Sequence, residues 1–233
     1  LYPSEQLVAQ ATDAGMNSIG WEENQGGVSM NFNQTKPPFD NKKAREAVSK
    51  AVDVQQMIDV VAMGYQEKIT SMFRESSPFY NAEYTFPEPN AEEAQRLFDE
   101  LAEETGGPLV VDMSVSTSSE NAARVTQIQT QLAQFENVEM GIRQVDAAAY
   151  GISLYTGDFE ASFYAVSSPY PVPTFDQFSS TYPVPIGRLN SPQADKAIAD
   201  GKSATDEAGR KAAYDSLQQV LVEDYPQLWM YRQ

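Results

Sequence analysis

Between residues 109 and 166 the chain alternates between strand-like and helix-like segments, and no other pattern narrows the possible folds as much. Apolar runs at 109–115, 138–145 and 159–166 are typical of buried strands. The segment that starts at Thr117 and Glu120 repeats its apolar side chains at helical spacing. Strands that alternate with helices are joined by crossovers into a sheet with helices on its faces. The pattern therefore predicts an α/β domain.

Capping and periodicity predict the remaining elements. The pairs Asp53 with Gln56 and Asn90 with Glu93 are capping-box patterns, each followed by an apolar helical stripe. Further helices are expected after Asp40, over 206–222 and, as a short piece, over 5–14. A glycine turn at 26–27 should precede a strand at 30–33, and the last strand should hold Trp229 in the core. Residues 65–90 and 167–190 are expected to be irregular.

Composition excludes several classes of function. The 233 residues contain no Cys and no His, which excludes a Ser-His-Asp triad, thiolate chemistry and an ordinary zinc site. The formal net charge of −17 opposes a nucleic-acid backbone. No apolar run of about 18 residues is present. We therefore expect no metal, no cofactor and no nucleic acid as partners.

Two stretches are candidate ligand sites, because ligands of open α/β sheets bind beyond the carboxyl ends of strands. The first is the hydroxyl-rich stretch at 114–119, where Ser116, Thr117 and Ser118 could donate hydrogen bonds. Simple capping of the following helix is the alternative interpretation. The second is the exit of the strand at 159–166, a stiff, aromatic stretch that contains Tyr164, Val166, Ser167, Ser168, Pro169, Tyr170 and Phe175. A surface loop that tucks its aromatic rings beneath itself is the alternative there.

A resemblance to a known family begins with the segment FNQTKPPFDNKKAREAVSKAVD at 32–53. It resembles the extracellular solute-binding proteins of peptide and nickel ABC importers, in which an Asn-containing strand leads to Pro-Pro-Phe-Asp and then to a helix with Arg and Ala. Matching residues here are Asn33, Pro37, Pro38, Phe39, Asp40, Arg45, Ala47, Ala51 and Asp53. The similarity continues through 77–80, 90–107, 128–132 and 157–160, so it covers nearly everything after residue 28.

This resemblance implies the C-terminal lobe of a type II periplasmic-binding-protein fold, with a mixed sheet flanked by helices. Residues 1–27 would lead in from the other lobe, and residues 28–233 would form the solute-binding lobe. The implied function is reversible capture of a peptide-like or other small solute outside the membrane, without catalysis, for delivery to membrane permease subunits. We expect an extracellular or periplasmic monomer, anchored by a lipoprotein N-terminus that lies outside this chain.

One departure from the family pattern concerns the ligand. Peptide binders of this family usually carry an acidic residue at the strand exit, which pairs with the α-ammonium of the ligand. No carboxylate lies between Glu160 and Asp176 here, and the acidic position falls at Pro169. An unpaired ammonium in a cleft is costly, so the sequence predicts a ligand other than an ordinary free-ended peptide, unless the missing lobe meets that charge. The alternatives to a transport function are a secreted hydrolase that uses paired carboxylates and a structural domain of a secreted protein.

Overall fold

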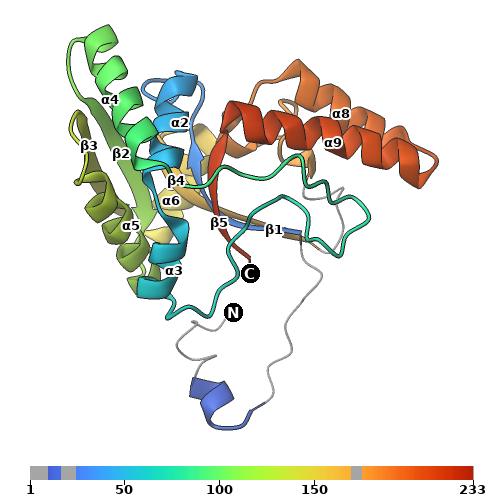
Figure 1. Cartoon of the computed structure of the whole chain (residues 1–233), viewed down its shortest axis with the longest axis horizontal. Coiled ribbons are helices and arrows are strands. Elements are labelled where there is room, and N and C mark those ends of the chain that lie inside the picture. Colours follow the sequence, from blue (N-terminus) through green and yellow to red (C-terminus); the bar gives the residue numbers. More distant parts are fainter. Residues whose placement is uncertain (1–9, 17–24, 169–174, 233) are drawn as a thin grey trace.

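The computed structural model describes residues 10–16, 25–168 and 175–232, which form a five-stranded mixed sheet with helices on both sides (Figure 1). In chain order, the elements are β1 (Gln25–Phe32), α2 (Lys42–Ala51), α3 (Val54–Val61), α4 (Ala91–Thr105), β2 (Leu109–Ser116), α5 (Ser119–Leu132), β3 (Val138–Val145), α6 (Ala147–Thr156), β4 (Ala161–Ser168), the 3-10 turn η1 (Ile186–Arg188), α8 (Pro192–Ser203), α9 (Glu207–Asp224) and β5 (Gln227–Tyr231). This is the α/β architecture that the sequence predicts.

The strand order is β3-β2-β4-β1-β5. β2 runs parallel to β3 and to β4, whereas β1 is antiparallel to both β4 and β5. The connections through α5 and α6 are therefore the predicted crossovers between parallel strands. β2 and β4 overlap only at Met113 with Ala161 and Ser114 with Ser162, so β4 extends well beyond the end of β2.

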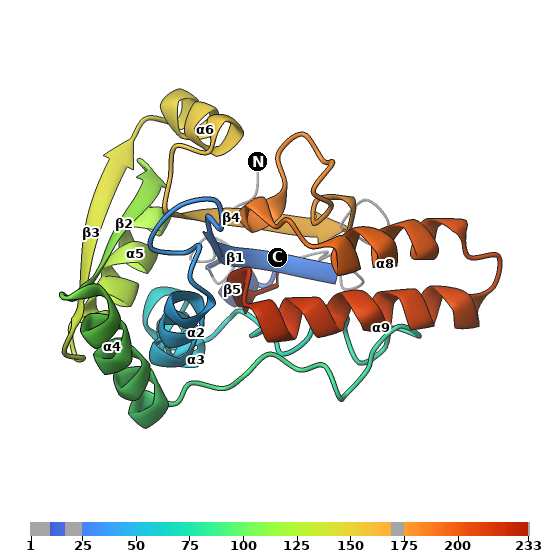
Figure 2. The same ribbon diagram turned by 90° about the horizontal axis from the view of Figure 1, so that it is seen from above.

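Two hydrophobic clusters pack against the sheet. The larger one joins α2, α3, α4 and α5 to the strands and includes the fully buried Phe32, Phe39 and Phe98. The smaller one lies under α8 and α9 and includes Trp229, which is 4% exposed, as the sequence predicts for the last strand. Figure 2 shows α8 and α9 side by side, away from the helices of the larger cluster. Among the helices described, none combines the length and the hydrophobicity needed to cross a bilayer.

The turn predicted at Gly26 and Gly27 is wrong, because both residues belong to β1 and pair with Ser167 and Val166 of β4. Their φ angles of 75° and 155° lie in a region that favours glycine. Gly27 allows a close approach to the end of β5, and the pair does not mark a reversal of the chain.

Most helix predictions are confirmed, since α2, α3, α4, α5 and α9 begin and end near the capping residues. Of the short helix expected at 5–14, only residues 10–14 lie in the described structure, and 10–13 are helical. β4 begins two residues later than expected, because Asn33 donates hydrogen bonds to Gly157 O and Phe159 O and holds that loop outside the strand.

The sequence interpretation missed α8. The buried side of this helix consists mainly of small residues, Ala194, Ala197 and Gly201, with Ile198, so its apolar period is weak. A usable signal was present at its start, because Ser191 caps Ala194 N and Pro192 occupies the first turn.

Candidate functional site

The end of β2 leads directly into the first turn of α5. The Ser118 hydroxyl accepts a hydrogen bond from Asn121 N at 3.1 Å, and the Ser116 hydroxyl accepts one from Asn121 Nδ2 at 2.7 Å. Thr117 is exposed, and its N–H donates to Val145 O at the end of β3. The expected capping is therefore present. Each serine oxygen accepts in these bonds, so its own proton can still be donated to a ligand.

The end of β4 places the predicted residues in different environments. The Tyr164 hydroxyl donates to Gln177 Oε1 at 3.1 Å, and burial raises the pKa of Tyr164. Ser167 pairs with Gly26 and Ser168 with Gln25, at the start of β1. The Ser167 hydroxyl oxygen is buried without a hydrogen-bond partner among the described residues.

Val166 and Phe175 are core residues, each 1% exposed. The Phe175 ring lies 5.2 Å from Phe73 and 4.8 Å from Tyr214, centroid to centroid. These two side chains therefore pack in the smaller hydrophobic cluster, behind the strand exit, and present almost no surface to a ligand. Pro169 and Tyr170 lie outside the described residues.

The two predicted groups of hydroxyls are not adjacent. Register places Ser116 level with Tyr164, four residues before Ser168, which corresponds to about 13 Å along the strand. α6 packs beside the first of these groups, because Tyr150 of this helix donates from its hydroxyl to Phe163 O of β4 at 2.5 Å, one residue before Tyr164. Figure 2 shows α6 lying over the sheet near β2 and β4.

The sequence interpretation did not select α6 as part of the site. Its last turns expose Ile152 at 65% and Tyr155 at 66%, and Arg188 holds the end of the helix by donating to Leu154 O and Tyr155 O. α6 is an apolar helix that buries only Ser153 among its residues, so it leaves an unusually apolar surface exposed. The run AAAYGISLYT, apolar on all sides and directly after a strand, was the available signal.

The two carboxylates that flank β4 and its exit in the sequence, one before the strand and one after it, already have partners. Glu160 Oε2 accepts from Asp112 N at 2.7 Å, and Asp176 pairs with Lys202 Nζ at 2.7 Å. Within the described ranges, no cluster of three or more Asp, Glu, His or Cys side chains could hold a metal ion. The described walls of this region therefore offer hydroxyls and apolar side chains, with no free carboxylate at these two positions.

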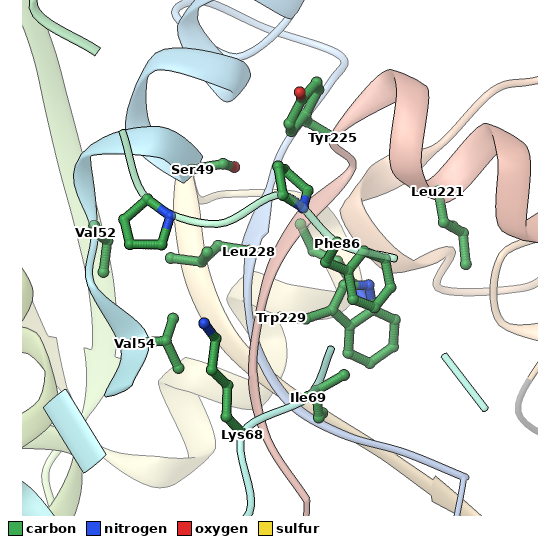
Figure 3. Close-up of a pocket in the computed structure, with 13 residues that line it drawn as sticks. Ser49, Val52, Val54, Lys68, Ile69, Phe86, Leu221, Tyr225, Leu228 and Trp229 are labelled. Atoms are coloured by element: carbon green, nitrogen blue, oxygen red, sulfur yellow. The ribbon is translucent and has the colours of Figure 1, made fainter. Parts of the chain in front are cut away.

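A small pocket lies elsewhere, between α2, α3, β5 and the segment at 68–89 (Figure 3). Its volume is about 30 Å³, and its lining includes Trp229, stacked on Phe86, together with Leu228 and Ile69. Small-molecule sites usually measure about 300–1,000 Å³. This pocket is therefore too small for a solute.

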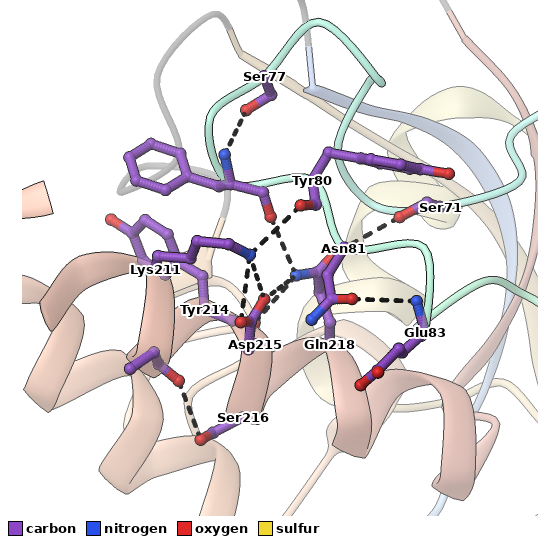
Figure 4. Close-up of polar contacts among 12 residues, drawn as sticks. Ser71, Ser77, Tyr80, Asn81, Glu83, Lys211, Tyr214, Asp215, Ser216 and Gln218 are labelled. Atoms are coloured by element: carbon purple, nitrogen blue, oxygen red, sulfur yellow. Dashed lines mark hydrogen bonds and ion pairs between the residues drawn. The ribbon is translucent and has the colours of Figure 1, made fainter. Parts of the chain in front are cut away.

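A larger hollow of about 540 Å³ lies where β5 ends, and its lining includes Arg74, Tyr80 and Arg232. The chain around it is fixed to α9 by polar contacts (Figure 4). Lys211 donates to Tyr80 O at 3.3 Å, and Gln218 donates to Phe79 O at 3.4 Å. These contacts fix the segment at 71–80 to α9, although the segment is irregular.

Comparison with known proteins gives a family match over most of the chain. The family model described as "Bacterial extracellular solute-binding proteins, family 5 Middle" matches residues 2–185. The periplasmic oligopeptide-binding protein OppA of Haemophilus influenzae is 26% identical over an alignment of 216 positions, and the match covers 86% of this chain and 39% of OppA.

Solved structures share the fold. The murein tripeptide binding protein MppA of Escherichia coli matches with a TM-score of 0.80 and 20% identity, over 99% of this chain and 47% of MppA. NikA from Brucella suis, solved in complex with Fe(III)-EDTA, matches with a TM-score of 0.80 and 20% identity, over 98% of this chain and 49% of NikA. The chain thus spans less than half the length of these three relatives. Because the family model matches well over half of its residues, the chain belongs to the bacterial extracellular solute-binding proteins of family 5.

Proposed function

We propose that this chain is the solute-binding lobe of the substrate-binding component of an ABC importer, which captures a small solute outside the membrane. The family match over residues 2–185 carries this proposal. The solute would be held reversibly between this lobe and the remainder of the protein, in a hinged closure without any covalent step.

In this proposal the ligand contacts come from the carboxyl ends of β2 and β4 and from α6. Ser116, Thr117 and Ser118 donate from their hydroxyls, while Ser167 and Ser168 meet polar groups at the other end of the solute. Tyr164 and Tyr170 provide ring surface, and Pro169 stiffens the exit. Val166 and Phe175 do not contact the solute in this proposal. They are buried in the core and support the residues that form the ligand surface. Ile152 and Tyr155 add an exposed apolar wall.

The proposed solute class lacks a free ammonium at this wall. The sequence from 161 to 175 contains no carboxylate, and the flanking Glu160 and Asp176 are engaged by Asp112 N and Lys202. A buried ammonium without a counter-charge costs several kcal/mol. A blocked peptide, or another uncharged and partly apolar solute, fits these residues better than a free-ended peptide.

Thermal-shift titration of the full-length protein tests this proposal with matched pairs of free and N-acetylated dipeptides and tripeptides. We expect the acetylated member of a pair to raise Tm more, because stabilisation grows with ligand concentration over Kd. Tight binding that requires the free amine would contradict the solute class. Silence across peptides, sugars and metal chelates would contradict the transport function.

The setting of the lobe follows from the same proposal. Residues 1–27 lead in from the other lobe, residues 28–233 form the solute-binding lobe, and a lipoprotein anchor outside this chain holds the protein at the membrane. The partners are permease subunits, and the protein acts as a monomer.

A carboxylate-dependent hydrolase finds no specific support in the described residues. Hydrolysis by paired acids needs two carboxylates that face one bond. Glu93 pairs with Arg96, which lowers the pKa of Glu93, and Glu104 pairs with Lys43. Asp158 pairs with Arg143, and Glu160 is bound as described above. Each of these acids is engaged in an ion pair or a backbone hydrogen bond, and none is shown facing a second acid across a common site. We therefore propose binding without catalysis.

A further inference from the structure

The start of β1 and the end of β5 lie at the same end of the sheet, because the two strands are antiparallel and Val28 pairs with Tyr231. The segment at 67–74 runs past both strand ends and acts as a strap. Lys68 forms a bridge to Tyr231, Ile69 N donates to Met230 O at 3.0 Å, and Gly26 N donates to Met72 O at 3.3 Å. The strap therefore ties β1 to β5 where the chain enters and leaves the sheet.

Arg232, which directly follows β5, is the main side chain that joins β5 to the start of β1 and to the strap at 67–74. Its guanidinium donates to Ser71 O at 2.9 Å, to Gly26 O at 3.2 Å and to Met72 O at 3.4 Å. The same group forms an ion pair with Glu67 at 3.2 Å, and Arg232 N donates to Glu67 O at 2.9 Å. One side chain thus contacts the start of β1 and both halves of the strap.

A second layer of contacts surrounds Arg232. Glu67 also pairs with Arg74, and Arg74 N donates to Gln25 Oε1 at 2.9 Å. The Arg232 side chain is 4% exposed, and burial lowers its pKa. A buried cation is tolerated only where hydrogen bonds and a counter-charge replace water. The planar guanidinium of arginine can donate hydrogen bonds to several carbonyl groups at once. The compact ammonium of lysine cannot reproduce this arrangement.

We propose that Arg232 is a positioning residue for solute capture, which locks the ends of β1 and β5 to the strap so that the lobe moves as one body about the two strands. This inference rests on the proposed two-lobed function, in which β1 and β5 carry the connections to the other lobe and their ends act as hinges. Arg232 does not contact the solute in this role.

The test compares Arg232→Lys with Arg45→Lys in the full-length, ligand-free protein. Arg45 is a matched control, because it is equally buried and donates to Phe39 O, Asp40 O and Asp224 O, away from the start of β1 and the end of β5. Both variants should lower Tm by a few degrees. Hydrogen exchange is then measured at 25–32 and 227–232, with residues 109–116 as an internal reference, and small-angle X-ray scattering reports the spread of overall dimensions.

We expect Arg232→Lys alone to accelerate exchange at the two strand ends by about tenfold or more and to broaden the distribution of dimensions. Equal changes in both variants, or no local change in Arg232→Lys, would show a merely structural role and overturn the proposal. Neither measurement needs a solute, so a negative solute screen would reject the transport function without deciding the role of Arg232.

Discussion

Gly27 lies where β1 closely approaches the end of β5. A Cβ atom at this position would lie 2.7 Å from Ile69 Cδ1 and 2.9 Å from Arg232 Cα, and it would also collide with Tyr231 O. With φ at 155°, an alanine is strained in addition. We expect Gly27→Ala to lower the free energy of unfolding by about 2–4 kcal/mol, measured by urea denaturation. Gly107→Ala is the control, since nothing lies within 4 Å of its added Cβ. Equal stability of the two variants would contradict the close approach.

Tyr150, whose hydroxyl joins α6 to β4, provides a second prediction at this scale, a pH dependence. Burial raises the pKa of Tyr150 to about 12, above its ordinary value of 10.0. Between these two values the unfolded chain has released the proton while the folded protein retains it, so stability falls as pH rises. We expect the stability gap between wild type and Tyr150→Phe to shrink by about 1 kcal/mol between pH 9 and pH 11, measured by urea denaturation. A constant gap would mean that the hydroxyl is exposed to solvent.

At the scale of elements, α9 holds the irregular segment at 71–80 through a few polar groups. Gln218, which is 1% exposed, donates to Phe79 O and accepts from Ser71 at 3.4 Å. We expect Gln218→Ala to release this segment and to increase limited proteolysis within 71–80 by roughly tenfold, because bonds to a buried partner are lost. Gln219→Ala is the control on the same helix, since Gln219 bonds only to Glu223 among the described residues. Equal cleavage of both variants would mean that other contacts hold the segment.

At the scale of the whole molecule, the proposed function gives this chain only one of the two walls that enclose a solute. Tight sites bury about 70–90% of a small ligand, and binding must also overcome the lost translational freedom of the ligand. We expect the isolated 233-residue chain to bind any solute found for the full-length protein at least about a hundredfold more weakly, measured by isothermal titration calorimetry. Circular dichroism would first establish that the isolated chain is folded. Equal affinity would place the complete site within this lobe.

Local patterns predicted much of this structure because their physical causes are contiguous in the chain. The N-caps at Asp53 and Asn90 each accept a hydrogen bond from a backbone N–H three residues later, and the parallel pair β2 and β3 follows from the strand–helix–strand alternation. The hydroxyls at 116–118 could be located at the end of β2 for the same reason.

Features that depend on distant segments could not be read from such patterns. Phe175 was expected at a ligand surface but is buried, because Phe73 and Tyr214 come from segments about 100 and 40 residues away to enclose it. The glycines at 26–27 are part of a strand because β4 pairs with them, and Arg232 is buried because the strap at 67–74 covers it. Local hydrogen bonds and periodicity are properties of neighbouring residues, whereas burial and close approach depend on which remote segments meet.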